Sequence, residues 1–249
     1  MHRLGIVFSF LLAISVANAD PWVAANNSWS STKRAADQVI HKDDGREFYC
    51  GCDYRSNNTS SGSGVITSLT RCGYQAPASN RSRAARIEWE HIVPASLMPA
   101  RRFQCWSQEG GSRTNCERTS ARARTMIFDL HNLVPAIGQA NALRGNDRYA
   151  ELPNIQGIFG ACPIKDTRGR FEPADCKKGD VARVWLYMEQ KHRVVIPPSE
   201  REMFLRWSER DPVSPWESKR QARVAAHTGI ENPFVSGIAP SPAGSCPWE

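Results

Sequence analysis

The chain of 249 residues lacks any apolar run long enough to cross a bilayer as a helix, which takes about 20 residues. Its longest apolar stretch, residues 4–16, falls short of that length, and no later segment approaches it. Internal repeats and long blocks of like charge are also missing, which argues against a repeat architecture and a charged disordered tail. We therefore expect no membrane-spanning segment.

The start of the chain is typical of a secretory signal peptide. A basic residue is followed by the short apolar run and by Ala-Asn-Ala at residues 17–19, a small-residue cleavage pattern. We predict that residues 1–19 are removed after Ala19, and that residues 20–249 form one domain with a sizeable core. The mature protein is then expected in the periplasm or outside the cell.

Eight cysteines in an exported chain imply disulfides, and their even number requires no free thiol. Zinc is less favoured, because Cys50 and Cys52 are one residue closer than a C-x₂-C knuckle and no second knuckle follows. Short separations favour two small loops, closed by Cys105–Cys116 and Cys162–Cys176. The remaining four, Cys50, Cys52, Cys72 and Cys246, would pair among themselves in an order that the sequence leaves open.

The chain is basic, with a formal net charge of +7 that becomes +6 once Arg3 leaves with the signal peptide. Arginine is concentrated in two stretches, at positions 81, 83 and 86 before Glu88 and at positions 118, 122 and 124 after Cys116. Its guanidinium donates two parallel hydrogen bonds to a phosphate. A polyanionic partner and a solvated basic face both fit this charge, so charge alone leaves the partner open.

Hydrophobic patterns predict an α+β fold of small sheets and helices. We expect strands at 47–54 and 65–69 around a polar loop, and a short helix at 32–42. In the C-terminal third, a helix with a buried face is expected after Asp180, because apolar residues follow at helical spacing at Val181, Val184, Trp185 and Met188. Capping boxes predict two further helices, one starting at Ser199 and one starting at Ser214 and stopping near Gly229.

The middle of the chain reads as strand, strand and helix. The first strand is expected at 86–91, before Val93-Pro94, and the second at 125–135, ended by its own proline. A helix is expected at 136–143, ended by Gly145. Such a compact unit can bring three elements together around one ion.

Glu90 and His91 are neighbours at the point where the first of these strands should end. Glu90 offers an oxygen ligand to a hard divalent cation, and His91 offers a base that titrates near neutral pH. In a regular strand Glu88 and Glu90 share one face and His91 lies on the other, so Glu90 and His91 meet one substrate only if the strand twists, bulges or ends there. The residues alone leave a phosphodiester hydrolase, a two-carboxylate glycosidase using Glu88 and Glu90, and a surface pair as alternatives.

Motifs along the chain resemble those of the bacterial endonuclease I family. The most specific are Glu-Trp-Glu-His-x-Val-Pro-Ala at 88–95 and His-Asn-Leu-x-Pro at 131–135. Further blocks occur in the family order at residues 48–52, 72–74, 104–106, 115–116, 144–146 and 232–234. The resemblance covers nearly all of residues 20–249. It implies one disulfide-stapled nuclease domain around a ββα-metal, or His-metal finger, core at about 86–146.

Carried over residue by residue, the resemblance implies that Glu90 and Asn141 bind one Mg²⁺, with Mn²⁺ or Ca²⁺ as alternative occupants. It implies that His91 is the general base and that Arg113 grips the phosphate. Glu88 is expected to orient a metal-bound water or an arginine. These five side chains are the candidate site.

Two departures from the family pattern bear on this site. Residues 141–146 read Asn-Ala-Leu-Arg-Gly-Asn where the family often has Asn-Gly-Asp-Arg-Gly-Asn, so the proposed ligand Asn141 is kept and an Asp is lost. The segment before Arg113 carries an extra residue, which leaves Arg101 and Arg102 as alternative phosphate contacts.

The resemblance implies a metal-dependent endonuclease that leaves 5′-phosphate and 3′-hydroxyl ends on single- and double-stranded DNA. RNA is expected as a second substrate, because the attack uses water and no 2′-hydroxyl. No recognition helix is apparent, so contacts to the backbone without sequence specificity are expected, from a monomer that does not bind membranes. The rival is a disulfide-rich polyanion-binding protein without catalysis, whose binding would not change in EDTA.

Overall fold

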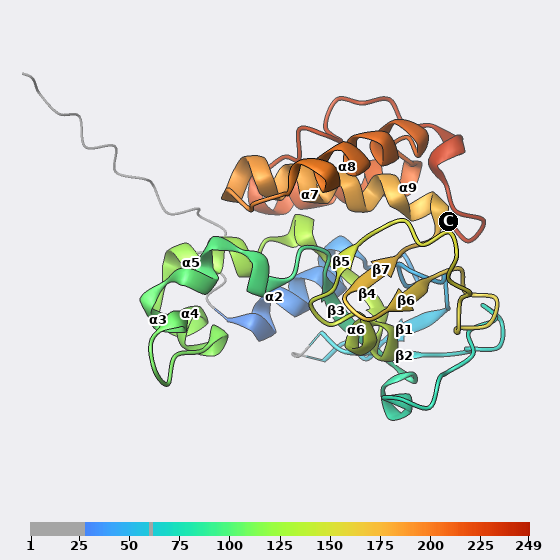
Figure 1. Ribbon diagram of the computed structural model, residues 1–249, viewed down its shortest axis with the longest axis horizontal. Helices are drawn as coiled ribbons and strands as arrows, with labels where there is room; N and C mark the ends of the chain where they lie inside the picture. The colour runs from blue at the N-terminus through green and yellow to red at the C-terminus, as the bar shows by residue number, and fades with distance from the viewer. Residues whose placement is uncertain (1–27, 60–61) are drawn as a thin grey trace, which may run out of the picture.

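The computed structural model describes residues 28–59 and 62–249 (Figure 1). The predicted signal peptide, residues 1–19, lies outside the described residues. Within the described part, no helix is both long enough and apolar enough to cross a membrane. The described residues form two small sheets and eight α-helices, so the predicted α+β class is confirmed.

The larger sheet has four strands in the order β1-β2-β3-β4, and all neighbours are antiparallel. The strands are β1 (Tyr54–Ser56), β2 (Gly64–Ile66), β3 (Arg86–His91) and β4 (Leu133–Ile137). The second sheet has the order β5-β7-β6, with β5 (Arg148–Tyr149) parallel to β7 (Arg170–Glu172) and β6 (Lys165–Thr167) antiparallel to it. The strand predicted at 86–91 is confirmed.

The helices fall into groups that Figure 1 shows plainly. Helices α3 (Gln104–Ser107), α4 (Arg113–Thr119) and α5 (Ala121–Ile127) gather at one end of the long axis, and α7 (Lys178–His192), α8 (Pro198–Arg210) and α9 (Pro215–Thr228) lie along one side of the sheets. Helix α2 (Trp29–Ala35), which continues as a π-helical turn (Ala36–Ile40), and α6 (Gly138–Arg144) pack close to the strands. Short 3₁₀ turns occupy Arg81–Arg83, Ala95–Leu97, Pro99–Arg102, Leu130–Asn132, Asp175–Lys177 and Pro242–Gly244.

The C-terminal helices follow their apolar pattern. In α7 the predicted core residues Val181, Val184, Trp185 and Met188 are all buried, and the Trp185 ring stacks on Phe204 of α8 at 5.2 Å. Helix α9 begins as predicted, because the Ser214 hydroxyl accepts the backbone N–H of Glu217. It ends before Gly229, whose φ of 75° suits a glycine.

The capping box predicted at Ser199 is wrong. Helix α8 already begins at Pro198, and Pro197 stands at its cap without a side-chain hydrogen bond. Proline suits the first turn, because its missing N–H has no partner there in any helix.

The second predicted strand, at 125–135, is also largely wrong. Residues up to Ile127 belong to α5, which Ser120 caps by accepting the N–H of Ala123, and only Leu133–Ile137 forms β4. Pro135 does not end this strand. It lies opposite Trp89 in the ladder, and because β4 is the edge of the sheet, its missing N–H costs no ladder bond.

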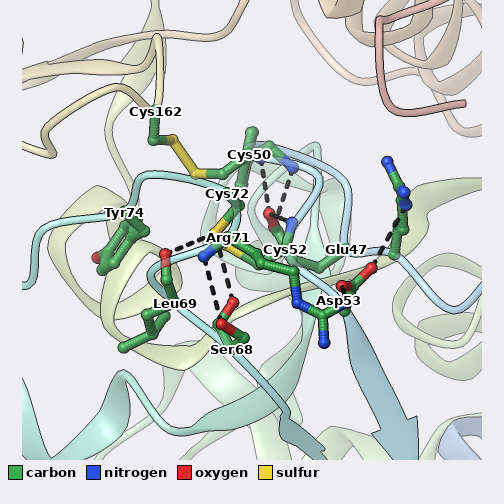
Figure 2. Close-up of a disulfide and its surroundings, with 12 residues drawn as sticks. Glu47, Cys50, Cys52, Asp53, Ser68, Leu69, Arg71, Cys72, Tyr74 and Cys162 are labelled. Atoms are coloured by element: carbon green, nitrogen blue, oxygen red, sulfur yellow. Dashed lines mark hydrogen bonds and ion pairs between the residues drawn. A yellow bond between two sulfur atoms is a disulfide. The ribbon is translucent and has the colours of Figure 1, made fainter.

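The strand predicted at 47–54 is a turn for most of its length. The Glu47 carboxylate accepts the backbone N–H groups of Tyr49, Cys50 and Cys52, so these donors are unavailable to a ladder (Figure 2). Gly51, with a φ of 68°, lies against Trp248, whose ring would overlap any Cβ at that position. Strand pairing therefore begins only at Tyr54.

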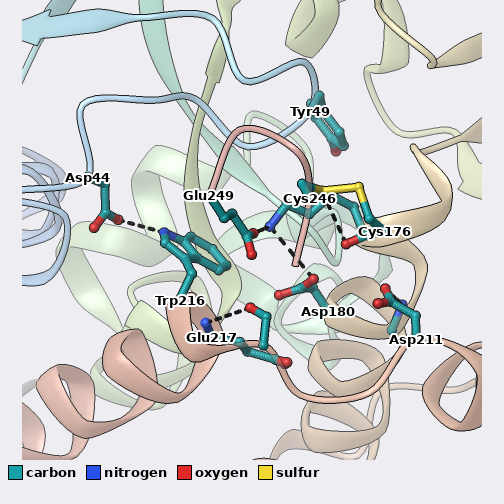
Figure 3. Close-up of polar contacts among 12 residues, drawn as sticks. Asp44, Tyr49, Cys176, Asp180, Asp211, Trp216, Glu217, Cys246 and Glu249 are labelled. Carbon is teal, nitrogen blue, oxygen red and sulfur yellow. Dashed lines mark hydrogen bonds and ion pairs between the residues drawn. A yellow bond between two sulfur atoms is a disulfide. The ribbon is translucent and has the colours of Figure 1, made fainter. Parts of the chain in front are cut away.

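Four disulfides join Cys50–Cys162, Cys52–Cys72, Cys105–Cys116 and Cys176–Cys246. All eight cysteines are described and paired, which leaves none for zinc. The Cys105–Cys116 pairing is confirmed. The Cys162–Cys176 pairing is wrong, because Cys162 meets the Glu47 turn (Figure 2) while Cys176, just before α7, holds the C-terminal tail (Figure 3).

Candidate active site

Strands β3 and β4 and helix α6 form a ββα unit inside the predicted core. Five ladder pairs run from Ile87–Ile137 to His91–Leu133, and α6 follows β4 directly. Beside this unit lies a cavity of about 660 Å³. All five predicted site residues line it: Glu88, Glu90, His91, Arg113 and Asn141. Glu90 and His91 both line this cavity although they are neighbours on β3, and His91 is the last residue of that strand.

The His91 ring is held in one orientation. Its Nε2 lies 2.7 Å from the Ile127 carbonyl oxygen, and since a carbonyl only accepts, Nε2 must carry the proton. The Trp29 ring stacks on it at 5.1 Å with an interplanar angle of 14°. In the part of the chain that the structure describes, Nδ1 has no hydrogen-bond partner. The neutral ring therefore keeps a lone pair on Nδ1.

Burial lowers the pKa of His91 to about 4, and the nearby charges of Arg113 and Arg144 act in the same direction. The hydrogen bond to Ile127 opposes this shift. The neutral form, which accepts a proton, is therefore the form present at neutral pH.

Glu90 is only 2% exposed, and one of its oxygens is fully engaged. Oε1 accepts a hydrogen bond from Arg144 Nη1 at 2.6 Å and another from the Tyr49 hydroxyl at 3.1 Å. Among described residues, Oε2 has no partner. Burial raises the pKa of Glu90, and the Arg144 charge opposes that shift.

Asn141 is oriented by Glu88. Its Nδ2 donates to Glu88 Oε2 at 3.0 Å, which leaves Oδ1 without a partner among the residues described. The Glu88 carboxylate also accepts from Arg83 Nε and Arg86 Nε, both at 2.8 Å. Burial favours the neutral acid, but these arginines prevail and lower the pKa of Glu88. Gly138 permits this packing, since a Cβ there would lie 2.8 Å from Glu88 Oε1.

Arg113 is the first residue of α4, behind the Ser112 cap. Its Nε contacts Glu117 at 2.9 Å, its guanidinium lies 5.7 Å from the Trp29 ring centre, and its side chain remains 40% exposed. Arg101 and Arg102 do not line the cavity, and Arg101 instead packs over Trp106. The position of Arg113 therefore favours it over both alternatives.

The donor set fits a small hard cation. A carboxylate oxygen of Glu90 and an amide oxygen of Asn141 are each left without a partner, while their other polar atoms are held by the protein. Oxygen ligands in small number, with remaining positions left to water and phosphate, are what Mg²⁺ prefers. Residues 28–59 and 62–249 contain no cluster of three or more His, Cys, Asp or Glu suited to a metal, so a larger protein cage is not formed there.

The sequence model that describes Endonuclease I matches residues 29–238 of this chain. The chain belongs to the endonuclease I family. The match includes the whole ββα unit and every residue that lines the cavity. The protein is thus a nuclease, a hydrolase of nucleic acids.

Curated relatives agree over most of the chain. An extracellular deoxyribonuclease of Aeromonas hydrophila is 35% identical, covering 83% of this chain and 89% of its own length. A periplasmic deoxyribonuclease of the same organism is 37% identical over 76% of this chain and 77% of its own length. Endonuclease-1 of Buchnera aphidicola subsp. Acyrthosiphon pisum is 35% identical over 79% and 76%.

Three further contributors to this family site were not predicted. Trp29 stacks on His91 from more than sixty positions away in the sequence, and no local pattern marks it. Tyr49 and Arg144 bind Glu90, although both stand in the family motifs quoted above. Their place in those motifs could have marked them as site residues, but their contact with Glu90 could be found only from the folded structure.

The glycosidase alternative does not fit this geometry. Glu88 is bound by two arginines and Asn141, which lower its pKa and hold it as a carboxylate, and Glu90 is bound through Oε1 by Arg144 and Tyr49. The match to the endonuclease I family likewise favours a nuclease over a glycosidase.

Proposed function

We propose that this protein is a metal-dependent endonuclease that hydrolyses phosphodiester bonds with His91 as the general base. One observation carries the proposal. Among the described contacts, His91 is hydrogen-bonded through Nε2 only, so Nδ1 is left to accept a proton. His91 lines the same cavity as Glu90 and Asn141, which offer oxygen ligands to a metal. The alternative of a binding protein without catalysis gives no reason for this arrangement.

In the reaction, a water molecule gives its proton to Nδ1 of His91 as it attacks the phosphorus. The Ile127 carbonyl stabilises the imidazolium that forms, because it accepts the Nε2–H. Arg113 supplies fixed positive charge to the phosphate. Mg²⁺ bound by Glu90 and Asn141 would neutralise charge that develops on the phosphate and on the leaving oxygen. Attack by water in line with the 3′ oxygen breaks the P–O3′ bond, and the departing 3′ oxygen takes a proton from solvent water, which leaves a 5′-phosphate and a 3′-hydroxyl.

The substrate is DNA, and RNA as well. The names of the relatives, deoxyribonuclease and endonuclease, support DNA. The basic net charge supports contacts to a polyanionic backbone, which carry no sequence information. Nothing in the proposed chemistry involves a 2′-hydroxyl, which supports RNA. Little sequence preference and a marked loss of affinity with salt follow.

The protein acts as a monomer in the periplasm or outside the cell. Support for this location comes from the signal-peptide pattern at residues 1–19, from four disulfides and from relatives named extracellular and periplasmic.

The test is degradation of supercoiled plasmid by the oxidised mature protein, with Mg²⁺ and with EDTA. Wild type should degrade the plasmid only with Mg²⁺. His91→Ala should lose about 10²–10⁴-fold in turnover while it keeps its affinity for DNA. His192→Ala is the matched control, because His192 is buried but does not line the cavity.

Plasmid that stays intact with oxidised protein and Mg²⁺ contradicts the proposal. The ends are checked by ligation: fragments that a DNA ligase rejoins without prior kinase treatment carry 5′-phosphates, whereas fragments that require the kinase contradict the proposed polarity of cleavage.

A further inference from the structure

The carboxylate of Glu90 is held by one side only. Oε1 accepts two hydrogen bonds, from Arg144 Nη1 at 2.6 Å and from the Tyr49 hydroxyl at 3.1 Å, and both hydrogen bonds of this carboxylate to described residues go to Oε1 and none to Oε2. A carboxylate oxygen has about two lone-pair positions. The two donors therefore fill Oε1, and Glu90 offers a single oxygen to the cavity.

Arg144 is built into the fold as a rigid donor. It is 1% exposed, and its guanidinium also donates to the carbonyl oxygens of His91 and Ile92, both at 2.7 Å. The ring of Tyr149 lies 4.7 Å from its charged carbon. Because Arg144 lies on α6, one turn after Asn141, the helix that carries the amide ligand also fixes the carboxylate ligand.

Tyr49 is fixed in the same way. Its hydroxyl lies 2.6 Å from the Tyr149 hydroxyl, and both side chains are buried. If Tyr49 donates its proton to Glu90, it accepts from Tyr149, so the two hydroxyls and the carboxylate form one directed chain. Neither tyrosine lines the cavity, so substrate cannot explain this arrangement.

The geometry gives Arg144 and Tyr49 a role in selecting between metal ions, and this inference rests on the proposed metal site. We propose that Arg144 and Tyr49 are positioning residues that restrict Glu90 to one coordinating oxygen and thereby favour Mg²⁺ over Ca²⁺. Mg²⁺ demands near-octahedral geometry and keeps several waters, which a single carboxylate oxygen allows. Ca²⁺ takes six to eight oxygens and often binds both oxygens of a carboxylate, which the filled Oε1 prevents.

The test measures binding and not turnover. Bound Mn²⁺ is followed by electron paramagnetic resonance in the oxidised full-length mature protein, and Mg²⁺ or Ca²⁺ is titrated in to displace it. Tyr49→Phe removes one donor and frees one lone pair of Oε1. Tyr149→Phe is the matched control, because it removes a buried hydroxyl of the same chain of hydrogen bonds without touching Glu90.

In Tyr49→Phe the ratio of Ca²⁺ affinity to Mg²⁺ affinity should rise about tenfold, as expected for the loss of a group that orients a metal ligand. In Tyr149→Phe the ratio should stay within about twofold of wild type, since no bond to Glu90 is lost. Arg144→Lys is the second variant. It keeps the positive charge but not the planar fork, and its ratio should move in the same direction as that of Tyr49→Phe.

Equal ratios in wild type, Tyr49→Phe and Arg144→Lys overturn the selectivity role, even if Mn²⁺ binds normally. The underlying metal site is judged separately by Glu90→Gln. If wild type binds no more Mn²⁺ than Glu90→Gln does, the proposed metal site itself is wrong, and this result is distinct from a failure of selectivity.

Discussion

Replacing Asn132 by alanine should damage both stability and turnover, because this side chain holds the loop that follows His91. Asn132 is fully buried, its Nδ2 donates to the Val93 carbonyl at 3.0 Å, and its Oδ1 accepts the Val93 N–H at 2.7 Å. Val93 is itself fully buried, so water cannot replace either bond. The Asn132 amide thus pairs with both the N–H and the C=O of Val93.

The expected loss of stability follows from these two bonds. Each buried backbone group left without a partner costs about 1–3 kcal/mol, so the loss of both bonds in Asn132→Ala should lower the free energy of unfolding by about 2–6 kcal/mol. For a chain of this size, that corresponds to a decrease in Tm of roughly 4–24 °C. Urea unfolding of the oxidised protein measures the loss, with the disulfides intact in both proteins.

Turnover should fall as well, because the loop starts at the residue after His91. A displacement of about 1 Å at a reacting group can cost about 100-fold in rate. We therefore expect kcat on a plasmid substrate to fall about 100-fold at a temperature where the variant is folded, with KM nearly unchanged.

Asn232→Ala is the matched control. Asn232 is also buried, and its side chain also donates to one carbonyl, that of Arg183, and accepts one N–H, that of Phe234. It does not line the cavity, so its replacement should cost similar stability and leave kcat unchanged. The reasoning is refuted if Asn132→Ala keeps the wild-type kcat, or if Asn232→Ala loses as much of it.

Three further predictions concern other parts of the fold. Burial lowers the pKa of His131 to about 4, so this residue binds more protons in the unfolded chain than in the folded one between pH 6.5 and pH 4. As pH falls through this window, His131→Gln should lose about 3 kcal/mol less stability than wild type in unfolding titrations, and an equal loss would contradict this. Gly138→Ala should push Glu88 away from Asn141 and weaken Mn²⁺ binding about tenfold by calorimetry, and unchanged affinity would contradict this. Replacing Cys105 and Cys116 by serine should lower the free energy of unfolding in urea by about 3 kcal/mol, which is the loop-closure entropy for cysteines 11 residues apart. A loss near zero would contradict this and mean that the unfolded chain is already ordered there.

Much of the site was predictable from the sequence because its residues are adjacent or share one local unit. Glu88, Glu90 and His91 lie on one strand, which ends at His91, three residues before Pro94. Asn141 lies on the helix that follows directly in the chain. The C-terminal helices were predictable for the same reason: the spacing of their apolar residues and the Ser214 cap are local properties, which the fold then buries and satisfies.

The errors arose where local signals competed with tertiary contacts. Residues 125–127 fall within the predicted strand, but the Ser120 cap and burial of Met126 and Ile127 against the core make them helical. Residues 47–52 contain strand-forming types, but the Glu47 carboxylate takes their N–H groups into a turn.

The amino-acid sequence by itself determined which chemical groups are present and which family the protein resembles. It also determined the strand β3 and the helix α6 that carry most of the site residues. Only the folded chain decided which groups meet. Cys50 forms a disulfide with Cys162, 112 positions away, and the Trp29 ring stacks on His91. Arg144 and Tyr49 donate hydrogen bonds to one oxygen of Glu90 and none to the other. The physical reason is that periodicity and capping act over a few residues, whereas these contacts depend on how whole elements pack, which no short segment specifies.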